Sequence, residues 1–155
     1  MAEISGHLAP VGRIGIVVSR YHERVTTRLL DGARTCLAEA GVSENDVDVL
    51  WVPGAFELGS AASALAATGR YAALVALGVV VRGETPHFEF VAGEASRALG
   101  TLATLHALPI GFGLLTVDTL EQALARAGGA AGNKGYEAAA AAIRTADAIR
   151  RARTG

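Results

Sequence analysis

Residues 78–90 read Gly78-Val79-Val80-Val81-Arg82-Gly83-Glu84-Thr85-Pro86-His87-Phe88-Glu89-Phe90, and they join a buried strand to a helix. The apolar run 72–81 ends in this stretch, and apolar residues then recur at helical spacing. Thr85 suits the N-cap of that helix and Pro86 its first position. Free N–H groups at such a start attract an anion such as phosphate, beside which His87 could move protons near neutral pH. The alternative is an ordinary strand-to-helix turn with a surface histidine.

The composition indicates a single folded domain. The chain has 155 residues, of which 51% are hydrophobic and 19% charged, and this balance excludes a disordered chain. The 14 Lys and Arg are matched by 15 Asp and Glu, so we expect no nucleic acid and no membrane as partner. The lone cysteine, Cys36, lies on an apolar helical stripe, which predicts core packing in a reducing compartment. Because no signal peptide or membrane-length apolar run is found, we expect a cytoplasmic protein.

Apolar patterns predict the secondary structure. Four short, largely β-branched runs predict strands at residues 13–18, 47–52, 72–81 and 109–116. Helical spacing predicts helices at about 25–41, 55–69, 86–107, from 119, and at about 135–153. Gly41 suits a C-terminal cap, and Thr119 with Gln122 matches a capping box. His106 falls on the apolar stripe of its helix and is interpreted as structural.

The strands alternate with helices four times, and each connection is long enough for a right-handed crossover. We therefore predict an α/β fold, a three-layer α/β/α sandwich with a four-stranded parallel sheet of the flavodoxin-like type. Residues 13–155 would form this single domain. Residues 1–12 would form an N-terminal arm, either a loose tail or an edge strand on a neighbouring subunit.

Polar and aromatic residues follow the predicted strands where they end. In an open parallel sheet, ligands bind beyond the carboxyl ends of the strands. Tyr21 could stack on a planar ligand, Glu57 could accept bonds from hydroxyls, and Arg126 could hold a phosphate with its planar fork. Each has a simpler interpretation. Tyr21 and Phe112 would be packed aromatics, Glu57 a partner of the helix dipole, and Arg126 and Lys134 solvated charges.

Several common catalytic motifs are absent. No Gly-x-Ser-x-Gly elbow occurs. The segment 132–135 (GNKG) lacks the spacing and the hydroxyl of a P-loop, and the segment 111–113 (GFG) lacks the third glycine of a dinucleotide site. Glu84, His87 and Glu89 are too few and too poorly flanked to argue for zinc, so no metal site is predicted.

Four blocks of the sequence resemble one enzyme family. They are VPGAFE (52–57), ALGVVVRGETPHF (76–88), GFGLLT (111–116) and a block that runs from EQA (121–123) through RAG (126–128) to GNKG (132–135). Their order and spacing are similar to those of the 6,7-dimethyl-8-ribityllumazine synthases. The resemblance covers roughly residues 12–150.

The resemblance implies the penultimate reaction of riboflavin biosynthesis. Family members join 5-amino-6-ribitylaminouracil to 3,4-dihydroxy-2-butanone 4-phosphate. The amine attacks the ketone to form an imine, phosphate leaves, the ring closes and water is lost. The family uses no metal or redox cofactor, so the expected partners are two small-molecule substrates.

The matching positions imply which residues bind the pyrimidine substrate. Tyr21 stands where the family usually has Phe or Trp, stacked on the ring. The run Val79, Val80 and Val81 would border the uracil through backbone groups. The ribityl chain would lie along Ala55, Phe56 and Glu57, with Glu57 accepting from its hydroxyls. Phe112 would reach a neighbour's site and cover the ring.

The same resemblance implies how the second substrate is bound. Glu84 and Thr85 would hold the phosphorylated ketone at the helix start, with His87 as proton donor and acceptor. Arg126 would reach a neighbouring subunit's site and bind phosphate. Lys134 would support the site electrostatically.

The resemblance also implies a homo-oligomer with sites between subunits. Family members are pentamers or shells of twelve pentamers, and the short connection 128–135 resembles that of shell-forming members. This predicts a 60-subunit shell, with a riboflavin synthase as a further partner. Two departures stand out: Arg20-Tyr21-His22 replaces the common Arg-Phe-Asn, and Leu58-Gly59 replaces Ile-Pro, which would loosen that helix start.

Two other functions remain open at this point. One is the archaeal-type riboflavin synthase, which shares the fold but uses two lumazine molecules. The pairing of Thr85 with Arg126 for phosphate argues against it. The other is a non-catalytic flavin- or lumazine-binding shell protein, against which the presence of His87 and Arg126 argues.

Overall fold

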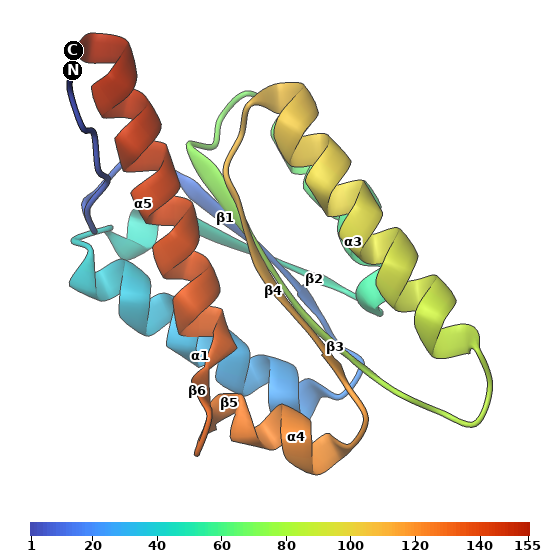
Figure 1. The fold of residues 1–155 in the computed structure, drawn as a ribbon. Coiled ribbons are helices and arrows are strands. Elements are labelled where there is room, and N and C mark those ends of the chain that lie inside the picture. Colours follow the sequence, from blue (N-terminus) through green and yellow to red (C-terminus); the bar gives the residue numbers. More distant parts are fainter.

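The structure is a computed structural model that describes residues 1–155 (Figure 1). The elements follow in the order β1 (Ile14–Ser19), α1 (Glu23–Glu39), β2 (Val47–Val52), α2 (Leu58–Ala67), β3 (Ala73–Val81), α3 (His87–His106), β4 (Ile110–Val117), α4 (Leu120–Ala125), β5 (Ala127–Gly129), β6 (Gly132–Asn133) and α5 (Lys134–Thr154). Short 3-10 turns, Glu44–Asp46 and Ala55–Glu57, precede β2 and α2. The four predicted strands are confirmed, each end within one residue.

The four main strands form one parallel sheet in the order β2-β1-β3-β4, as predicted. Ile14 of β1 lies opposite both Val47 of β2 and Ala73 of β3, while Leu74 of β3 lies opposite Ile110 of β4. The two central strands, β1 and β3, are buried almost throughout, which explains their continuous apolar sequence. All four carboxyl ends therefore meet at one edge of the sheet.

Helices cover both faces of the sheet, which confirms the three-layer sandwich. One buried cluster joins α1 and α5 to the strands, and a second joins α2 and α3 to the opposite face. Figure 1 shows α1 and α5 on one side of the sheet and α3 on the other. Cys36 is buried in the first cluster, as predicted, and burial raises the pKa of its thiol.

Small residues let α5 approach the sheet and α1 closely. A Cβ on Gly111 of β4 would lie 2.2 Å from the carbonyl oxygen of Ala138, and one on Gly135 would lie 1.9 Å from that of Leu29. Four residues of the alanine run are buried, which confirms the closely packed helix: Ala138, Ala139, Ala140 and Ala142. Gly59 likewise allows close packing, since a Cβ built on it would lie 2.8 Å from that of Ala98. The helix α2 begins at Leu58 although position 59 has no proline.

Helix ends and connections test the finer predictions. Gly41 has φ 83°, and Thr119 and Gln122 form the predicted capping box at α4. The placement of His106 on the apolar, packed stripe of its helix is wrong, because its side chain is exposed in the last turn of α3, where the helix dipole favours cations. The glycine-rich break forms a short antiparallel hairpin, β5–β6, which no pattern predicted. None of the helices is both long and apolar enough to cross a membrane.

The N-terminal arm has no helix or strand and lies along α5. The His7 N–H donates to Asp147 Oδ2 at 2.8 Å, and a Cβ on Gly6 would lie 1.8 Å from the Arg144 carbonyl oxygen. Asp147 is fully buried and also accepts from Arg151 Nε at 2.8 Å and from Arg150. These bonds, that of His7 foremost, hold the pKa of Asp147 well below its usual range.

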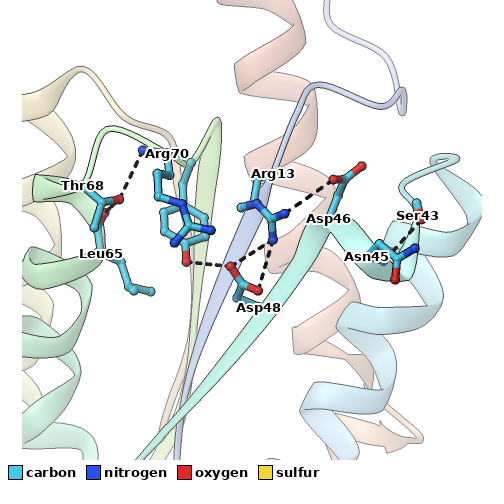
Figure 2. A network of polar contacts seen from close by, with 9 residues as sticks. Arg13, Ser43, Asn45, Asp46, Asp48, Leu65, Thr68 and Arg70 are labelled. Carbon is cyan, nitrogen blue, oxygen red and sulfur yellow. Dashed lines mark hydrogen bonds and ion pairs between the residues drawn. The ribbon is translucent and has the colours of Figure 1, made fainter.

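A second polar cluster ties the amino ends of the strands together (Figure 2). Arg13 NH1 donates to both carboxylate oxygens of Asp48 at 3.2 Å, and the Tyr71 hydroxyl donates to Asp48 Oδ2 at 2.7 Å. The Tyr71 bond lowers the pKa of Asp48, while burial and this bond raise the pKa of Tyr71. The cluster links the chain before β1 to β2 and to the chain before β3, at the edge opposite the carboxyl ends.

Candidate functional site

A cavity of about 690 Å³ opens at the carboxyl ends of the strands. Its lining includes most of the residues that the sequence predicts for ligand binding: Tyr21, Ala55, Phe56, Glu57, Val79, Val80, Val81, Thr85 and His87. They come from the ends of β1, β2 and β3 and from the start of α3. The fold therefore brings together residues that lie as much as 66 positions apart, from 21 to 87.

The floor of the cavity is apolar and one wall carries a carboxylate. Val79 and Val80 are buried in β3, and Ala55 is buried in the 3-10 turn that leads to α2. Glu57, the last residue of that turn, is half-buried, and its carboxylate makes no hydrogen bond or ion pair with the chain. A Cβ on Gly54 would lie 3.3 Å from Glu57 Oε1, so the bare backbone there leaves room for the carboxylate. This unpaired acceptor is available to the hydroxyls of a ligand.

The β3–α3 connection carries the proton-transfer candidate. The predicted cap is wrong by one residue: α3 begins at His87, with Pro86 as its N-cap. The ψ of Pro86 is 2°, outside the helical range, while its carbonyl already accepts from Glu89 N at 2.9 Å. Thr85 therefore precedes the cap, and its exposed hydroxyl makes no capping bond.

The first turn of α3 offers unpaired donors to the cavity. The N–H groups of His87 and Phe88 make no hydrogen bond within the chain. The side chain of His87 is exposed, lines the cavity and has no hydrogen-bond or ion-pair partner in the chain. An anion at this helix start would lie beside the unpaired imidazole of His87.

Exposed aromatic rings form the rim. Tyr21 is 65% exposed and meets His22 edge to face at 4.5 Å, and Phe56 is 58% exposed. Phe112, on the edge strand β4, is also exposed, so neither Tyr21 nor Phe112 is a core aromatic. His22, at the start of α1, has φ 57°, a left-handed conformation in which Asn is common. This left-handed backbone explains why the family commonly has Asn at this position.

Four of the predicted residues lie outside the cavity of the same chain: Glu84, Phe112, Arg126 and Lys134. Glu84 is exposed in the β3–α3 connection. Arg126 follows α4, where its NH1 donates to the Gln122 carbonyl at 3.0 Å, and Lys134 Nζ lies 3.8 Å from Glu137 Oε1. Arg126 and Lys134 are thus surface cations that bind their own helices, and this chain alone does not bring them to His87.

Five residues of the lining were not among the predicted site residues: Gly54, Gly83, Phe88, Phe90 and Val91. Phe90 and Val91 lie three and four positions after His87, so they share its face of α3. That spacing was visible in the sequence and could have found them. No group of three His, Cys, Asp or Glu side chains comes together as a metal site would require.

Comparison with known proteins identifies the family of the chain. The family profile described as 6,7-dimethyl-8-ribityllumazine synthase matches residues 12–150, which is nearly the whole chain. The match includes every residue of the cavity, from Tyr21 to Val91, and also Phe112, Arg126 and Lys134. The chain therefore belongs to the 6,7-dimethyl-8-ribityllumazine synthase family, the transferases that condense 5-amino-6-ribitylaminouracil with 3,4-dihydroxy-2-butanone 4-phosphate in riboflavin biosynthesis.

Proposed function

We propose that the cavity beside His87 is the catalytic site for this condensation, and that a neighbouring subunit completes it. The observation that carries the proposal is the unpaired state of the polar groups in the cavity. The carboxylate of Glu57, the imidazole of His87 and two N–H groups of α3 have no partner in the chain. Groups left without partners in a cleft are those that a ligand can satisfy.

The pyrimidine substrate fits the apolar end of the cavity. Its ring would stack on Tyr21 and contact Val79, Val80 and Val81 of β3. The ribityl chain would lie along the 3-10 turn 55–57, where the Glu57 carboxylate accepts from its hydroxyls. This assignment places the reactive amine toward the start of α3.

The phosphorylated ketone fits the start of α3. Its phosphate would accept from the free N–H groups of His87 and Phe88 and from the Thr85 hydroxyl, with Glu84 at the edge of this site. Arg126 of a neighbouring subunit would add a charge-assisted pair, and the neighbour's Phe112 would cover the ring. Lys134 would contribute positive potential from its place beside the hairpin.

His87 would transfer protons in several steps. It would take a proton from the attacking amine and return one to the departing hydroxyl as the imine forms. Holding both substrates together would supply most of the rate gain. The histidine would add about a hundredfold, which is the usual lower bound for a positioned acid or base.

The exposed aromatic and aliphatic side chains support an assembly with sites between subunits. Phe90 and Leu105 of α3 are 73% and 75% exposed, and Phe112 lies on the unpaired edge of the sheet. Large exposed apolar side chains along one helix and the adjoining edge strand are typical of interfaces. We infer a pentamer that assembles further into a 60-subunit cytoplasmic shell, able to enclose a riboflavin synthase.

The test is an absorbance assay of the lumazine chromophore with both substrates. His87→Ala should slow turnover about a hundredfold but retain some activity, because substrate positioning remains. Arg126→Ala should abolish capture of the phosphorylated ketone. An unaltered single-turnover rate in His87→Ala would refute the role of the histidine.

Mixed assemblies test whether the site is shared. The two variants would be unfolded, mixed in equal amounts and refolded together. A shared site needs His87 from one subunit and Arg126 from its neighbour, so about a quarter of the sites regain both groups. No recovery of activity in an assembly of native mass would refute the shared site. Light scattering gives that mass, and a particle of five chains would refute the shell.

A further inference from the structure

Arg82 lies outside the cavity, but its side chain contacts three residues around it. It follows the last residue of β3 and opens the connection to α3. Its Nε donates to Asp118 Oδ1 at 2.8 Å, and its NH1 lies 3.9 Å from Glu89 Oε1. Its guanidinium carbon lies 4.6 Å from the centre of the Phe88 ring, a cation–π contact. One side chain therefore joins the end of β4 to the first turn of α3.

Phe88 separates the catalytic cavity from a second, smaller one. The catalytic cavity is lined by Phe88 together with His87. The second, of about 360 Å³, is lined by Phe88 together with Arg82 and Asp118. Phe88 thus lines both cavities, and the Arg82 guanidinium that contacts its ring lines only the second.

The β3–α3 connection has few other restraints. At one end Arg82 N donates to the Val117 carbonyl at 2.8 Å, and at the other the Pro86 carbonyl accepts from α3. Between these ends, residues 83–85 make no hydrogen bond with the chain, and no atom lies within 4 Å of a Cβ built on Gly83. Besides the packing of Phe88 and Val91 against the core, the side chain of Arg82 therefore makes the polar contacts that tie the first turn of α3 to the end of β4.

We propose that Arg82 is a positioning residue for His87. By holding Phe88 and Glu89 toward Asp118, it fixes the first turn of α3 and the imidazole that begins it. Each contact is individually modest, because all three charged groups are largely exposed. The rate is far more sensitive, because a displacement of about 1 Å of a reacting group can cost a hundredfold. The inference rests on the proposed role of His87.

The first experiment compares two arginines in exposed ion pairs. Arg82→Gln removes the positive charge and the planar fork, and we expect a single-turnover rate about tenfold slower at saturating substrates. Arg97→Gln is the control, because Arg97 lies on α3, the helix that begins at His87, and its Nε donates to Glu94 Oε2 at 3.1 Å outside the cavity. Its rate should be unchanged. Arg82→Lys keeps the charge without the fork and should recover only part of the rate.

A double-mutant cycle separates positioning from general support of the fold. If Arg82 acts through His87, Arg82→Gln should slow wild type about tenfold but leave the His87→Ala variant unaffected. An Arg82→Gln rate equal to that of wild type would overturn the inference. The same tenfold loss in wild type and in the His87→Ala variant would also overturn it. An unaltered rate in His87→Ala would instead refute the proposed role of the histidine itself. The two failures are thus distinguishable in one set of assays.

Discussion

The carboxyl and amino ends of the strands use their polar residues in opposite ways. At the carboxyl ends, Glu57 and His87 line a cavity and have no partner in the chain. At the amino ends, Arg13, Asp48 and Tyr71 bond to one another at 2.7 to 3.2 Å. Polar groups at the amino ends are satisfied within the fold, and those that line the cavity are left free. The pairing state of a side chain thus separates residues that bond within the fold from those proposed to serve the ligand.

Two carboxylates show the contrast most clearly. Asp147 is buried and accepts bonds from His7, Arg150 and Arg151, which hold its pKa well below the usual range. Glu57 is half-buried beside the substrate cavity and accepts none. Removing the charge of each should therefore damage a different property of the protein.

Glu57→Gln should show the larger effect, and on activity alone. Loss of a charged acceptor for the ribityl hydroxyls should raise the KM for the pyrimidine substrate about tenfold or more, since hydrogen bonds to charged groups contribute about 1.5–3 kcal/mol. The midpoint of urea unfolding should not change, because the carboxylate has no partner to lose. Steady-state kinetics and urea titration measure the two. A lower urea midpoint with an unchanged KM would reverse the assignment.

Asp147→Asn should show the opposite behaviour. The neutral amide loses charge-assisted bonds to two arginines, so we expect a melting temperature about 5 °C lower at pH 7 with an unchanged rate. Because the folded pKa of Asp147 is depressed, its stabilisation is present above the unfolded pKa near 4 and is lost as the pH falls below it. The difference between variant and wild type should therefore shrink from pH 5 toward pH 2. A constant difference would show that the charge of Asp147 is not its source.

Patterns local in sequence predicted the fold and most of the cavity. β3 was predicted within one residue because its nine residues form an unbroken apolar run. Tyr21, Glu57 and His87 were found because parallel strands place their carboxyl ends together, whatever the sequence distance. The hairpin β5–β6 was missed because glycine and alanine carry no periodic signal.

Contacts between distant residues escaped prediction. His7 and Asp147 are 140 positions apart, and Asp48 is 35 from Arg13 and 23 from Tyr71. No spacing rule connects such pairs, because their meeting depends on the finished fold. For the same reason only the resemblance indicated that Phe112 and Arg126 reach a neighbouring subunit's site, and a single chain leaves them outside the cavity.

Ser19 is the exception that sharpens the contrast, because it is a buried polar group without a partner. Ser19 is the last residue of β1, and its hydroxyl lies among apolar neighbours. A Cβ built on Gly78 would lie 3.1 Å from Ser19 Oγ and 3.2 Å from a Leu58 methyl, so Gly78 and Leu58 both lie close to the hydroxyl. Ser19→Ala should therefore raise the free energy of unfolding by about 1 kcal/mol, since an unsatisfied buried hydroxyl is unfavourable. Ser96→Ala is the control, because Ser96 Oγ donates to the Ala92 carbonyl at 2.7 Å and its loss should give no gain. Equal effects of both changes in urea titration would contradict this reading of Ser19.

The smallest predicted effect concerns backbone strain. One strained residue lies near the carboxyl ends of the strands and one near the amino ends. His22 at the carboxyl edge and Ala107 at the amino edge are the only non-glycine residues with positive φ, 57° and 47°. Ala107→Gly should raise the free energy of unfolding by about 0.5 kcal/mol, because relief of left-handed strain outweighs the entropy of glycine. His22→Asn should gain less, since histidine already tolerates this region and the edge-to-face contact with Tyr21 is lost. If His22→Asn also changed the KM for the pyrimidine substrate while Ala107→Gly did not, the strained backbone at His22 would serve to place Tyr21. The carboxyl ends of the strands would then hold a strained residue as well as unpaired polar groups for the ligand.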